Sequence, residues 1–595
     1  MHSPRPWVAL TTAAVLSAGL LAVASSGTAG ATSPQQTRPR FAGGMAQPVY
    51  GAAPADWIRQ SLWVTTTTDS DRNGRPDRVH ISVTRLRETR TRGLEVPVIY
   101  EVSPYYAGIR AARMHDVDVP LFAPAPRRPV ATDADPRTWL PRGFAVVHAD
   151  SLGTGSSTGC PTSGGRNETL GAKAVVDWLN GRAVARNRAG RVVRAGWSTG
   201  KVGMIGTSYN GTLPNAVAAT GVEGLEAVVA VSAISSWYDY YRAGGAVVAP
   251  GGFQGEDTDV LARAVLTRAR PSTCRPVLRR LTRRQDRRTG DYSAFWAQRN
   301  YVDDADRVRA AVLVAHGLRD WNVKTKHAGQ WYAALRRAGV PHKIYLHQGG
   351  HGGLPPAGLL NRWFTHHLLG VDNGVQGAPH AYVRRPGGRL VSYREWPDRS
   401  AEPVDLRLRP RRATTRGRLV LGRPGRPVVE RVVDTPRLTA GRLAAAPRSR
   451  HGRVYATAPL RTAVRLSGTP VARLRLSFGQ RAANVSVGLV DYARNGRVRR
   501  VVTRGWRDPQ NRGSLAVTRR VRPGRVYGLR VGLQPHDHVF ARGHRIGLLV
   551  MSTDAQFTLR PPAGSTLALR THRTSLRLPV VGGRPAVRRA LARLN

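Results

Sequence analysis

The sequence predicts an α/β domain followed by an all-β domain. Between residues 47 and 375, apolar strand-like runs alternate with helix-like segments such as Glu168–Gly181, as a mostly parallel sheet requires. From residue 380 to 595 the pattern changes to short β runs separated by Gly, Pro and Arg turns. We therefore expect a β-sandwich to follow the α/β domain.

Strands and helices of both regions can be assigned in chain order. A helical cap is expected at about 240–308, and Trp363–Gly370 is predicted to close the α/β domain because a glycine ends its apolar pattern. The expected strands of the first region are Leu62–Thr67, Arg78–Thr84, Val96–Val102, the short run before Ser208, Ala227–Ala233, Ala310–Ala315 and Lys343–His347. Those of the second region include Val471–Phe478, Asn484–Val490, Val526–Val531 and Arg545–Val550.

Ser208 is the strongest indication of function. It stands between glycines in Gly203–Gly211, where an apolar strand breaks into a Gly-x-Ser-x-x-Gly turn. Such a turn lifts a serine hydroxyl above the sheet edge as a nucleophile, while the next backbone N–H points at the developing oxyanion. Asn210 takes the usual place of the second glycine, where we expect it to tolerate unusual backbone angles.

Partners for this serine follow in the order that an α/β-hydrolase requires, first an acid and then a histidine. Asp320 comes just after the apolar run Ala310–Ala315, and His351 lies in a Gly-rich loop after Lys343–His347. The sequence therefore predicts that His351 is the general base and that Asp320 orients it. The backbone N–H of Tyr209 and the hydroxyl of Tyr105 are the expected oxyanion donors, although Tyr105 could instead pack its ring on the sheet edge.

Five segments together resemble the Xaa-Pro dipeptidyl-peptidase family of serine hydrolases, whose relatives include cocaine esterase and α-amino-acid ester hydrolases. They are Ser103–Tyr106, Asp150–Gly155, Gly206–Gly211, His316–Val323 and Gly349–Gly352. The resemblance extends from about residue 47 to the C-terminus. It implies an α/β-hydrolase domain with a helical cap, a C-terminal jelly-roll domain, and release of N-terminal Xaa-Pro dipeptides through an acyl-enzyme.

Substrate-binding residues are implied by the same resemblance. Trp237 and Tyr240 match residues that line the family's proline pocket, and Glu256 matches the residue that binds the substrate α-ammonium. A carboxylate suits that task because it forms a charge-assisted hydrogen bond with an ammonium group. Asn322, beside the catalytic acid, is a further pocket candidate. The alternatives are an apolar cap core for the rings and a solvated loop acid for Glu256.

The first 31 residues have the pattern of a secretory signal peptide. Weakly basic residues precede the apolar run Val8–Ala24, and Ala29–Ala31 offers a small-x-small cleavage point. Residues 32–46 are expected to be a linker. We therefore expect a secreted, extracellular protein without a membrane span, with an uncleaved N-terminal anchor as the alternative.

Cys160 and Cys274 are the two cysteines of the chain. An exported protein can oxidise such a pair, so a disulfide that ties the cap to the α/β domain is predicted, with two buried thiols as the alternative.

The formal charge is +55, and five of the 92 basic residues are lysine while the rest are arginine. Such a charge attracts polyanions in a salt-dependent way. The arginines are spread along the chain and match no nucleic-acid-binding motif, so no specific nucleic-acid partner is expected. The arginine bias indicates coding composition, so polyanion binding is expected to be adventitious, for example as attachment to an anionic cell wall. The sequence gives no oligomeric state.

One loop resembles a calcium-binding loop. Asp69, Asp71, Asn73 and Asp77 supply oxygen ligands at positions 1, 3, 5 and 9 with a glycine at position 6, but His80 stands where a closing Glu is usual. An Asx-rich hairpin turn explains the pattern without metal. No other cofactor is expected, and any calcium here would be structural.

The sequence thus predicts a secreted serine exopeptidase whose substrates are peptides with proline second from a free N-terminus. An esterase or amino-acid ester hydrolase would use the same triad. A binding protein without catalytic activity, attached to the cell wall, is the alternative from another class.

Overall fold

The computed structural model describes residues 38–117, 132–411, 416–559, 561 and 564–592. The predicted signal peptide and residues 32–37 of the predicted linker lie outside the described residues. The described part of that linker forms a hairpin of β1 (Phe41–Ala42) and β2 (Met45–Ala46). Ala46 is buried, and its backbone N–H donates to the side chains of Asn361 and Thr365 at 3.1 Å each. These residues are therefore docked on the α/β domain, which corrects the expectation of a linker throughout 32–46.

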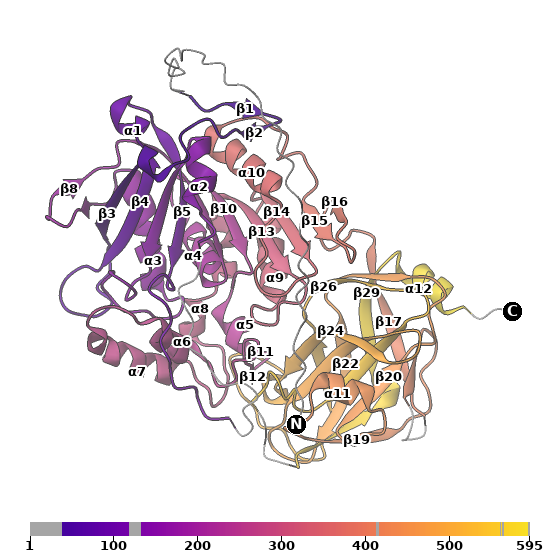
Figure 1. The fold of residues 1–595 in the computed structure, drawn as a ribbon. Coiled ribbons are helices and arrows are strands. Elements are labelled where there is room, and N and C mark those ends of the chain that lie inside the picture. Colours follow the sequence, from indigo (N-terminus) through magenta and orange to yellow (C-terminus); the bar gives the residue numbers. More distant parts are fainter. Residues whose placement is uncertain (1–37, 118–131, 412–415, 560, 562–563, 593–595) are drawn as a thin grey trace, which may run out of the picture. The chain divides into compact units, whose positions relative to one another are not determined.

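Among the described residues of the first domain, twelve strands form one sheet (Figure 1). Seven strands, from β15 to β6 in sheet order, run parallel to one another, and the strands that flank them pair antiparallel. In sheet order the strands are β16 (Leu390–Tyr393), β15 (Ala381–Arg384), β14 (His342–His347), β13 (Ala311–Gly317), β10 (Leu225–Val231), β9 (Ser198–Thr207), β5 (Val96–Ser103), β6 (Ala145–Asp150), β4 (Arg78–Leu86), β3 (Trp57–Thr65), β7 (Ala185–Arg186) and β8 (Val192–Val193).

Helices cover both faces of this sheet, which explains why its central strands are apolar throughout. Alternate residues of β10 belong to two different apolar cores. One core holds buried side chains of α3, α4 and α9, and the other holds those of α2 and α10. The bounds are α2 (Pro136–Trp139), α3 (Arg166–Leu179), α4 (Tyr209–Ala218), α9 (Lys326–Arg337) and α10 (Ala357–Leu369), with a short α1 (Glu88–Thr91) near the edge. Gly370 ends α10 in a left-handed conformation, as predicted.

The cap consists of short helices and one small hairpin. Its elements are α5 (Trp237–Tyr241), β11 (Arg242–Ala243), β12 (Ala246–Val247), α6 (Thr258–Val265), α7 (Arg275–Arg284) and α8 (Ala294–Ala297), with 3₁₀ turns between them. Cys160 and Cys274 form the predicted disulfide, which joins the segment after β6 to the residue before α7.

In the described part of the all-β domain thirteen strands pair mostly antiparallel, around a large apolar core and a smaller one beside α11 (Ala440–Ala445). They are β17 (Ala401–Arg409), β18 (Gly417–Val420), β19 (Val429–Val433), β20 (Gly452–Ala456), β21 (Val464–Gly468), β22 (Val471–Phe478), β23 (Val485–Tyr492), β24 (Val498–Arg507), β25 (Tyr527–Gly532), β26 (His536–Phe540), β27 (Arg545–Met551), β28 (Thr566–Arg570) and β29 (Ser575–Val581). Two helices, α11 and α12 (Gly583–Leu591), accompany them.

The division between the two sheets lies later than the predicted 375/380 boundary. β15 pairs parallel with β14, and β16 pairs antiparallel with β15, so both extend the first sheet. These strands are four residues long each and separated by turn residues, so their sequence resembles the short β runs of the second domain. Only their pairing partners distinguish β15 and β16 from the strands of the second domain.

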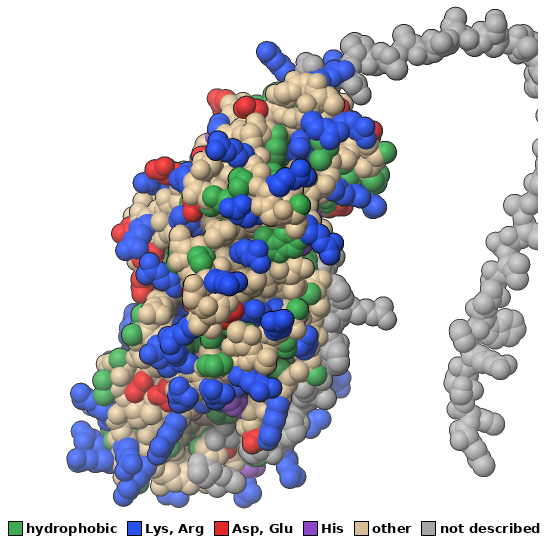
Figure 2. Space-filling view, turned by 90° about the vertical axis from the view of Figure 1, so that its left-hand side faces the viewer, with side chains coloured by type: hydrophobic (Ala, Val, Ile, Leu, Met, Phe, Trp, Pro, Cys, Tyr) green, Lys and Arg blue, Asp and Glu red, His purple; other side chains and the backbone are tan. Residues whose placement is uncertain are grey.

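Positive charge is spread over the face of the molecule shown in Figure 2. Figure 2 shows Lys and Arg side chains over the whole of one face, with few acidic side chains between them and no single basic patch. Among the described residues, no helix combines the length and the apolar character needed to cross a bilayer.

Candidate active site

Ser208 occupies the sharp turn between β9 and α4. Its backbone has φ 67° and ψ −123°, a left-handed conformation that costs a residue with a side chain about 1–3 kcal/mol. The turn is held because the Ser208 N–H donates to the carbonyl oxygen of Val231 and its own carbonyl oxygen accepts from the N–H of Thr212, both at 2.8 Å. The strained serine at the carboxyl end of a central strand is the arrangement that the motif predicts.

Two glycines make this turn sterically allowed. A Cβ on Gly206 would lie 2.5 Å from the carbonyl oxygen of Asn210, and a Cβ on Gly211 would lie 2.4 Å from that of Gly206. Asn210 itself has no positive φ, so the expectation that it tolerates unusual backbone angles is wrong. Its side-chain amide instead donates to Oε1 of Glu101 at 2.7 Å. Gly211 allows the close approach, which is why the residue before it need not be glycine.

Asp320 and His351 meet at the ends of two neighbouring strands. Asp320 follows β13, His351 follows β14, and Nδ1 of the imidazole lies 2.8 Å from Oδ2 of the carboxylate. The other carboxylate oxygen accepts two backbone N–H groups of the following turn, at 3.0 Å each. Asp320 is buried, whereas the His351 side chain is 31% exposed. This contact directs the Nδ1–H toward Asp320 and leaves Nε2 available as a base.

The loop that carries His351 is fixed from both sides. Nε2 of His347 donates to the carbonyl oxygen of Gly352 at 2.8 Å, because its Nδ1 accepts the N–H of Gly349 at 3.1 Å. The N–H of Gly352 donates to the Ser232 hydroxyl at 3.0 Å. These hydrogen bonds thus hold the loop that carries His351 in place.

One cavity of about 440 Å³ contains most of the predicted site residues. Ser208 and His351 both line it, although no hydrogen bond joins their side chains in the described structure. Such contacts commonly tighten when substrate binds. The predicted residues that also line the cavity are Tyr105, Tyr240, Glu256 and Asn322.

Trp237 and the ring of Tyr209 lie behind this cavity wall. Trp237 is fully buried, its indole N–H donates to the Tyr301 hydroxyl at 3.0 Å, and its ring packs edge-on against Tyr240 with centroids 5.7 Å apart. The Tyr209 ring is likewise buried. Its backbone N–H is the first of α4, one of the donors that lack a partner within a helix. The resemblance had implied that Trp237 lines the cavity. In the structure Trp237 instead supports Tyr240 from behind.

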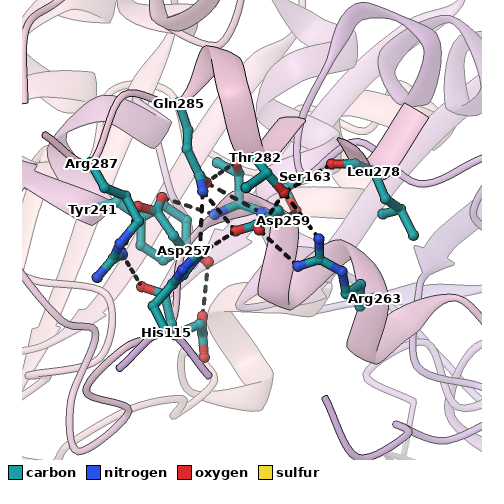
Figure 3. Close-up of polar contacts among 12 residues, drawn as sticks. His115, Ser163, Tyr241, Asp257, Asp259, Arg263, Leu278, Thr282, Gln285 and Arg287 are labelled. Carbon is teal, nitrogen blue, oxygen red and sulfur yellow. Dashed lines mark hydrogen bonds and ion pairs between the residues drawn. The ribbon is translucent and has the colours of Figure 1, made fainter. Parts of the chain in front are cut away.

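Glu256 is held at the cavity by the cap. Its Oε1 accepts the hydroxyl of Tyr241 at 2.8 Å. The next residue, Asp257, is completely buried between the guanidinium groups of Arg242 and Arg287, each 2.9 Å from its Oδ2. Figure 3 shows how this network continues into Asp259.

Asp259 ties the helices of the cap together. It accepts hydrogen bonds from the side chains of His115, Arg263, Thr282 and Gln285 at 2.7–2.9 Å. Although burial opposes the charged form, these donors hold the pKa of Asp259 well below its usual range. The loop that carries Glu256 is therefore anchored by an ionised buried network (Figure 3).

Sequence reasoning missed three ionisable groups near the site. Burial raises the pKa of Asp133, which lines the cavity, to about 6. Burial lowers the pKa of Lys324 to about 7, and its ammonium lies 3.0 Å from the carbonyl oxygen of Ala249 behind the cavity. Glu101 is buried in β5 and accepts the Asn210 amide. Of these three groups only Glu101 had a signal in the sequence, since it is an acid inside the apolar run Val96–Val102.

The all-β domain contacts the loop that carries Asp320. Trp321, the residue after Asp320, packs against Phe557 and Trp506 with ring centroids 5.6 and 6.4 Å apart. The hydroxyl of Thr325 donates to the carbonyl oxygen of Pro535 at 2.6 Å. The second domain thus supports the loop that carries Asp320, and none of its described residues lines the cavity.

Family models match both domains. The model of the X-Pro dipeptidyl-peptidase (S15 family) matches residues 73–353, and that of the X-Pro dipeptidyl-peptidase C-terminal non-catalytic domain matches residues 373–587. The first range lies within the α/β domain and its cap, and the second covers the all-β domain together with β15 and β16.

Two relatives match about nine-tenths of this chain. A Bacillus anthracis protein described as "Putative Xaa-Pro dipeptidyl-peptidase" is 44% identical over 545 residues, which cover 90% of this chain and 90% of that protein. The Xaa-Pro dipeptidyl-peptidase of Ligilactobacillus salivarius is 30% identical over 639 residues, covering 91% of this chain and 79% of that protein.

Solved structures share the fold. An α-amino acid ester hydrolase superposes with a TM-score of 0.64 at 17% identity, covering 93% of this chain and 100% of that one. An aminopeptidase from a marine sediment Thaumarchaeota archaeon gives 0.63 at 18%, covering 88% and 97%. With 44% identity over nine-tenths of its length and both family models matched, this chain belongs to the X-Pro dipeptidyl-peptidase (S15) family of serine hydrolases.

Proposed function

We propose that this protein is an exported exopeptidase that releases Xaa-Pro dipeptides from peptide N-termini through an acyl-enzyme on Ser208. One observation carries the proposal: Ser208 and His351 share a cavity with the carboxylate of Glu256, and His351 is hydrogen-bonded to the buried Asp320. This cavity combines a nucleophile and its base with an acceptor for a free N-terminus.

Acylation begins when Nε2 of His351 takes the Ser208 proton as Oγ attacks the carbonyl carbon of the proline. Asp320 stabilises the imidazolium that results, because its carboxylate accepts the Nδ1–H at 2.8 Å. The negative charge that develops on the carbonyl oxygen is stabilised by the backbone N–H of Tyr209 and the hydroxyl of Tyr105, which lines the cavity.

Collapse of the tetrahedral intermediate breaks the C–N bond. The imidazolium donates its proton to the leaving amine, the shortened peptide departs, and the dipeptide stays bound to Ser208 as an ester. Water then attacks this ester with His351 again as base, which releases the Xaa-Pro dipeptide and restores the free hydroxyl.

Selection of the second residue from the N-terminus follows from the cap. Glu256 accepts hydrogen bonds from the substrate ammonium, and the rings of Tyr240 and Phe253, which also line the cavity, pack against the proline. Trp237 acts indirectly, by holding Tyr240 from behind. The fixed distance between the Glu256 carboxylate and Ser208 thus selects substrates that have two residues between the free N-terminus and the bond that is cleaved.

Matched substrates test this selection. Gly-Pro-anilide should be cleaved well, while N-acetyl-Gly-Pro-anilide, which lacks the ammonium, and Gly-Ala-anilide, which lacks the ring, should be cleaved at least about tenfold more slowly. Equal turnover of the free and acetylated substrates would defeat the ammonium site. Absence of a fluorophosphonate adduct on Ser208 in folded protein would favour a non-catalytic binding protein.

Export and wall attachment belong to the same proposal. The apolar run Val8–Ala24 and the small residues after it support export, and the net charge of +55 supports binding to an anionic wall. Fractionation of cells that express the full chain tests both. The mature protein should lack its first 31 residues and leave the wall fraction when salt is raised, whereas full-length protein retained in the cytoplasm would contradict export.

A further inference from the structure

The loop between β3 and β4 contains three aspartates whose carboxylates converge. One oxygen from each of Asp69, Asp71 and Asp77 lies within 4.8 Å of the other two. Such a concentration of negative charge is unfavourable unless something positive lies within it. Among the described residues, these three aspartates form one ion pair, which joins Asp71 to Arg268.

Two of these carboxylates each leave one buried oxygen without a hydrogen bond. The side chain of Asp71 is 0% exposed, and while its Oδ2 accepts from Arg268 at 2.7 Å, its Oδ1 has no partner in the described structure. Asp77 is 1% exposed. Its Oδ2 accepts the Ser70 N–H at 2.8 Å and the Thr68 hydroxyl at 3.3 Å, while its Oδ1 again has no partner. A buried carboxylate oxygen left in this way is costly, and two in one loop indicate a missing ligand.

A plain Asx-rich turn accounts for only half of the loop. It explains Asp69, whose two oxygens accept the N–H groups of Asn73 and Gly74 at 3.0 and 2.8 Å. It also explains Asn73, whose Oδ1 accepts the N–H of Arg75 at 2.9 Å. It leaves the buried oxygens of Asp71 and Asp77 unexplained. A bound cation therefore accounts for more of this loop than a turn alone does.

His80 takes no part in this cluster. Its Nε2 lies 2.8 Å from the Ser61 hydroxyl, and its Nδ1 lies 2.9 Å from Oδ2 of Asp150. The absence of a closing Glu at that position, which weakened the sequence pattern, is therefore not decisive, because Asp77 supplies the buried carboxylate of the loop.

We propose that the loop Asp69–Asp77 binds one Ca²⁺ ion through the carboxylates of Asp69, Asp71 and Asp77. The donors are all oxygen, which favours a hard cation over zinc or copper. A site of several carboxylates in a flexible loop suits Ca²⁺ better than Mg²⁺, which demands a strict octahedron and keeps most of its waters.

The ion would fasten the β3–β4 hairpin to the disulfide segment. The hydroxyl of Ser70 accepts the N–H of Cys160 at 2.8 Å, and Arg268 donates both to Asp71 and to the carbonyl oxygen of Gly159 at 2.7 Å each. A Cβ on Gly159 would lie 2.6 Å from Oγ of Ser70, so the two segments are in close contact. Loss of the ion would therefore loosen the attachment of the segment before the cap, and its effect is on stability rather than on the chemical step.

The test uses the full chain, stripped with EDTA and transferred to chelator-free buffer. Isothermal titration with CaCl₂ should give one site per chain, and saturating Ca²⁺ should raise the Tm by roughly 2 °C or more, because a ligand that binds only the folded state stabilises it. Asp71→Asn and Asp77→Asn should abolish both effects, while Asp372→Asn, an exposed acid elsewhere, should keep them.

If the buried variants do not fold, Asp69→Asn serves instead, since its carboxylate is exposed and its loss should weaken binding at least about tenfold. Sensitised Tb³⁺ luminescence that Ca²⁺ displaces would support the same site. The proposal is overturned if wild-type protein binds no stoichiometric Ca²⁺ at millimolar concentration, or if Mg²⁺ raises the Tm and Ca²⁺ does not. Neither readout depends on peptidase activity, so the two proposals fail separately.

Discussion

The two ends of the active-site cavity are built differently. At the catalytic end, Ser208, Asp320 and His351 each follow a strand of the central sheet within a few residues. At the cap end, Glu256 lies in a loop whose position depends on the buried pairs of Asp257 with Arg242 and Arg287. The chemistry thus rests on regular elements, while the selection of substrate rests on contacts between segments far apart in the chain.

This difference suggests that the two functions can be altered separately. A change at the catalytic end should remove turnover of every substrate, because it removes transition-state stabilisation common to all of them. A change at the cap end should alter which substrates are preferred. Three predictions test this separation and a fourth concerns Lys324, in order from the largest expected effect to the smallest.

Ser208→Ala should lower kcat by about 10⁴-fold or more, and Asp320→Asn by on the order of 10⁴-fold, because either change disables the proton transfer at His351. Both should act equally on Gly-Pro-anilide and on its N-acetylated form. Steady-state kinetics on protein with an unchanged circular dichroism spectrum measures this. Ser163→Ala is the matched control, since that hydroxyl is committed to the carbonyl oxygen of Thr258 in the cap.

Tyr105→Phe should lower kcat by about 10²-fold with little change in KM, because it removes one donor to the oxyanion while keeping the ring. The ring packs edge-on against Tyr209 with centroids 6.1 Å apart, so the fold should be retained. Tyr106→Phe, at the adjacent position and outside the cavity lining, provides the comparison. A normal kcat for Tyr105→Phe would leave the second oxyanion donor unassigned.

Glu256→Gln should lower kcat/KM on Gly-Pro-anilide by about 10–100-fold, which corresponds to the loss of a charge-assisted hydrogen bond. It should scarcely affect the slow cleavage of the N-acetylated substrate, so the ratio between the two substrates collapses. Glu402→Gln, in β17 of the second domain, is the control. If the ratio survives in Glu256→Gln, another group binds the substrate ammonium.

Lys324 lies behind the cavity and should make stability depend on pH. It contacts the backbone carbonyl oxygens of Tyr240 and Ala249, and burial, offset in part by Asp320, lowers its pKa to about 7 against 10.5 in the unfolded chain. Between those values the unfolded chain binds more protons, so the free energy of unfolding should rise with pH by up to about 1.4 kcal/mol per pH unit.

Urea unfolding from pH 7 to 9 measures this slope. The slope should be smaller in Lys324→Met and unchanged in Lys201→Met, whose lysine is exposed. Equal slopes in all three proteins would mean that Lys324 keeps an ordinary pKa in the folded state.

The residues proposed to be catalytic could be placed together from the sequence because their signals are local. Ser208 sits in a glycine-flanked break after a strand, and Asp320 and His351 follow apolar runs in the order that the fold imposes. The cap end could not be predicted in the same way. Trp237 matched a family position, yet it is buried behind Tyr240, because the packing of α5 and not its sequence decides which ring faces the cavity.

Domain limits show the same contrast. β15 and β16 have the sequence of short β runs, and only pairing with β14 assigns them to the first sheet. Likewise the aspartates of the β3–β4 loop are visible in the sequence, but whether a turn alone satisfies them depends on which oxygens remain buried and unpaired.

The sequence by itself determined the two-domain order, the strand ends that carry Ser208, His351 and Asp320, and the pair of cysteines, because each depends on neighbouring residues or on strand ends that meet at one sheet edge. Tertiary structure alone decided which aromatic rings face the substrate, where Lys324 and Asp133 lie, and how the all-β domain braces the acid loop. Burial and charge pairing arise between segments distant in the chain, and no local pattern encodes them.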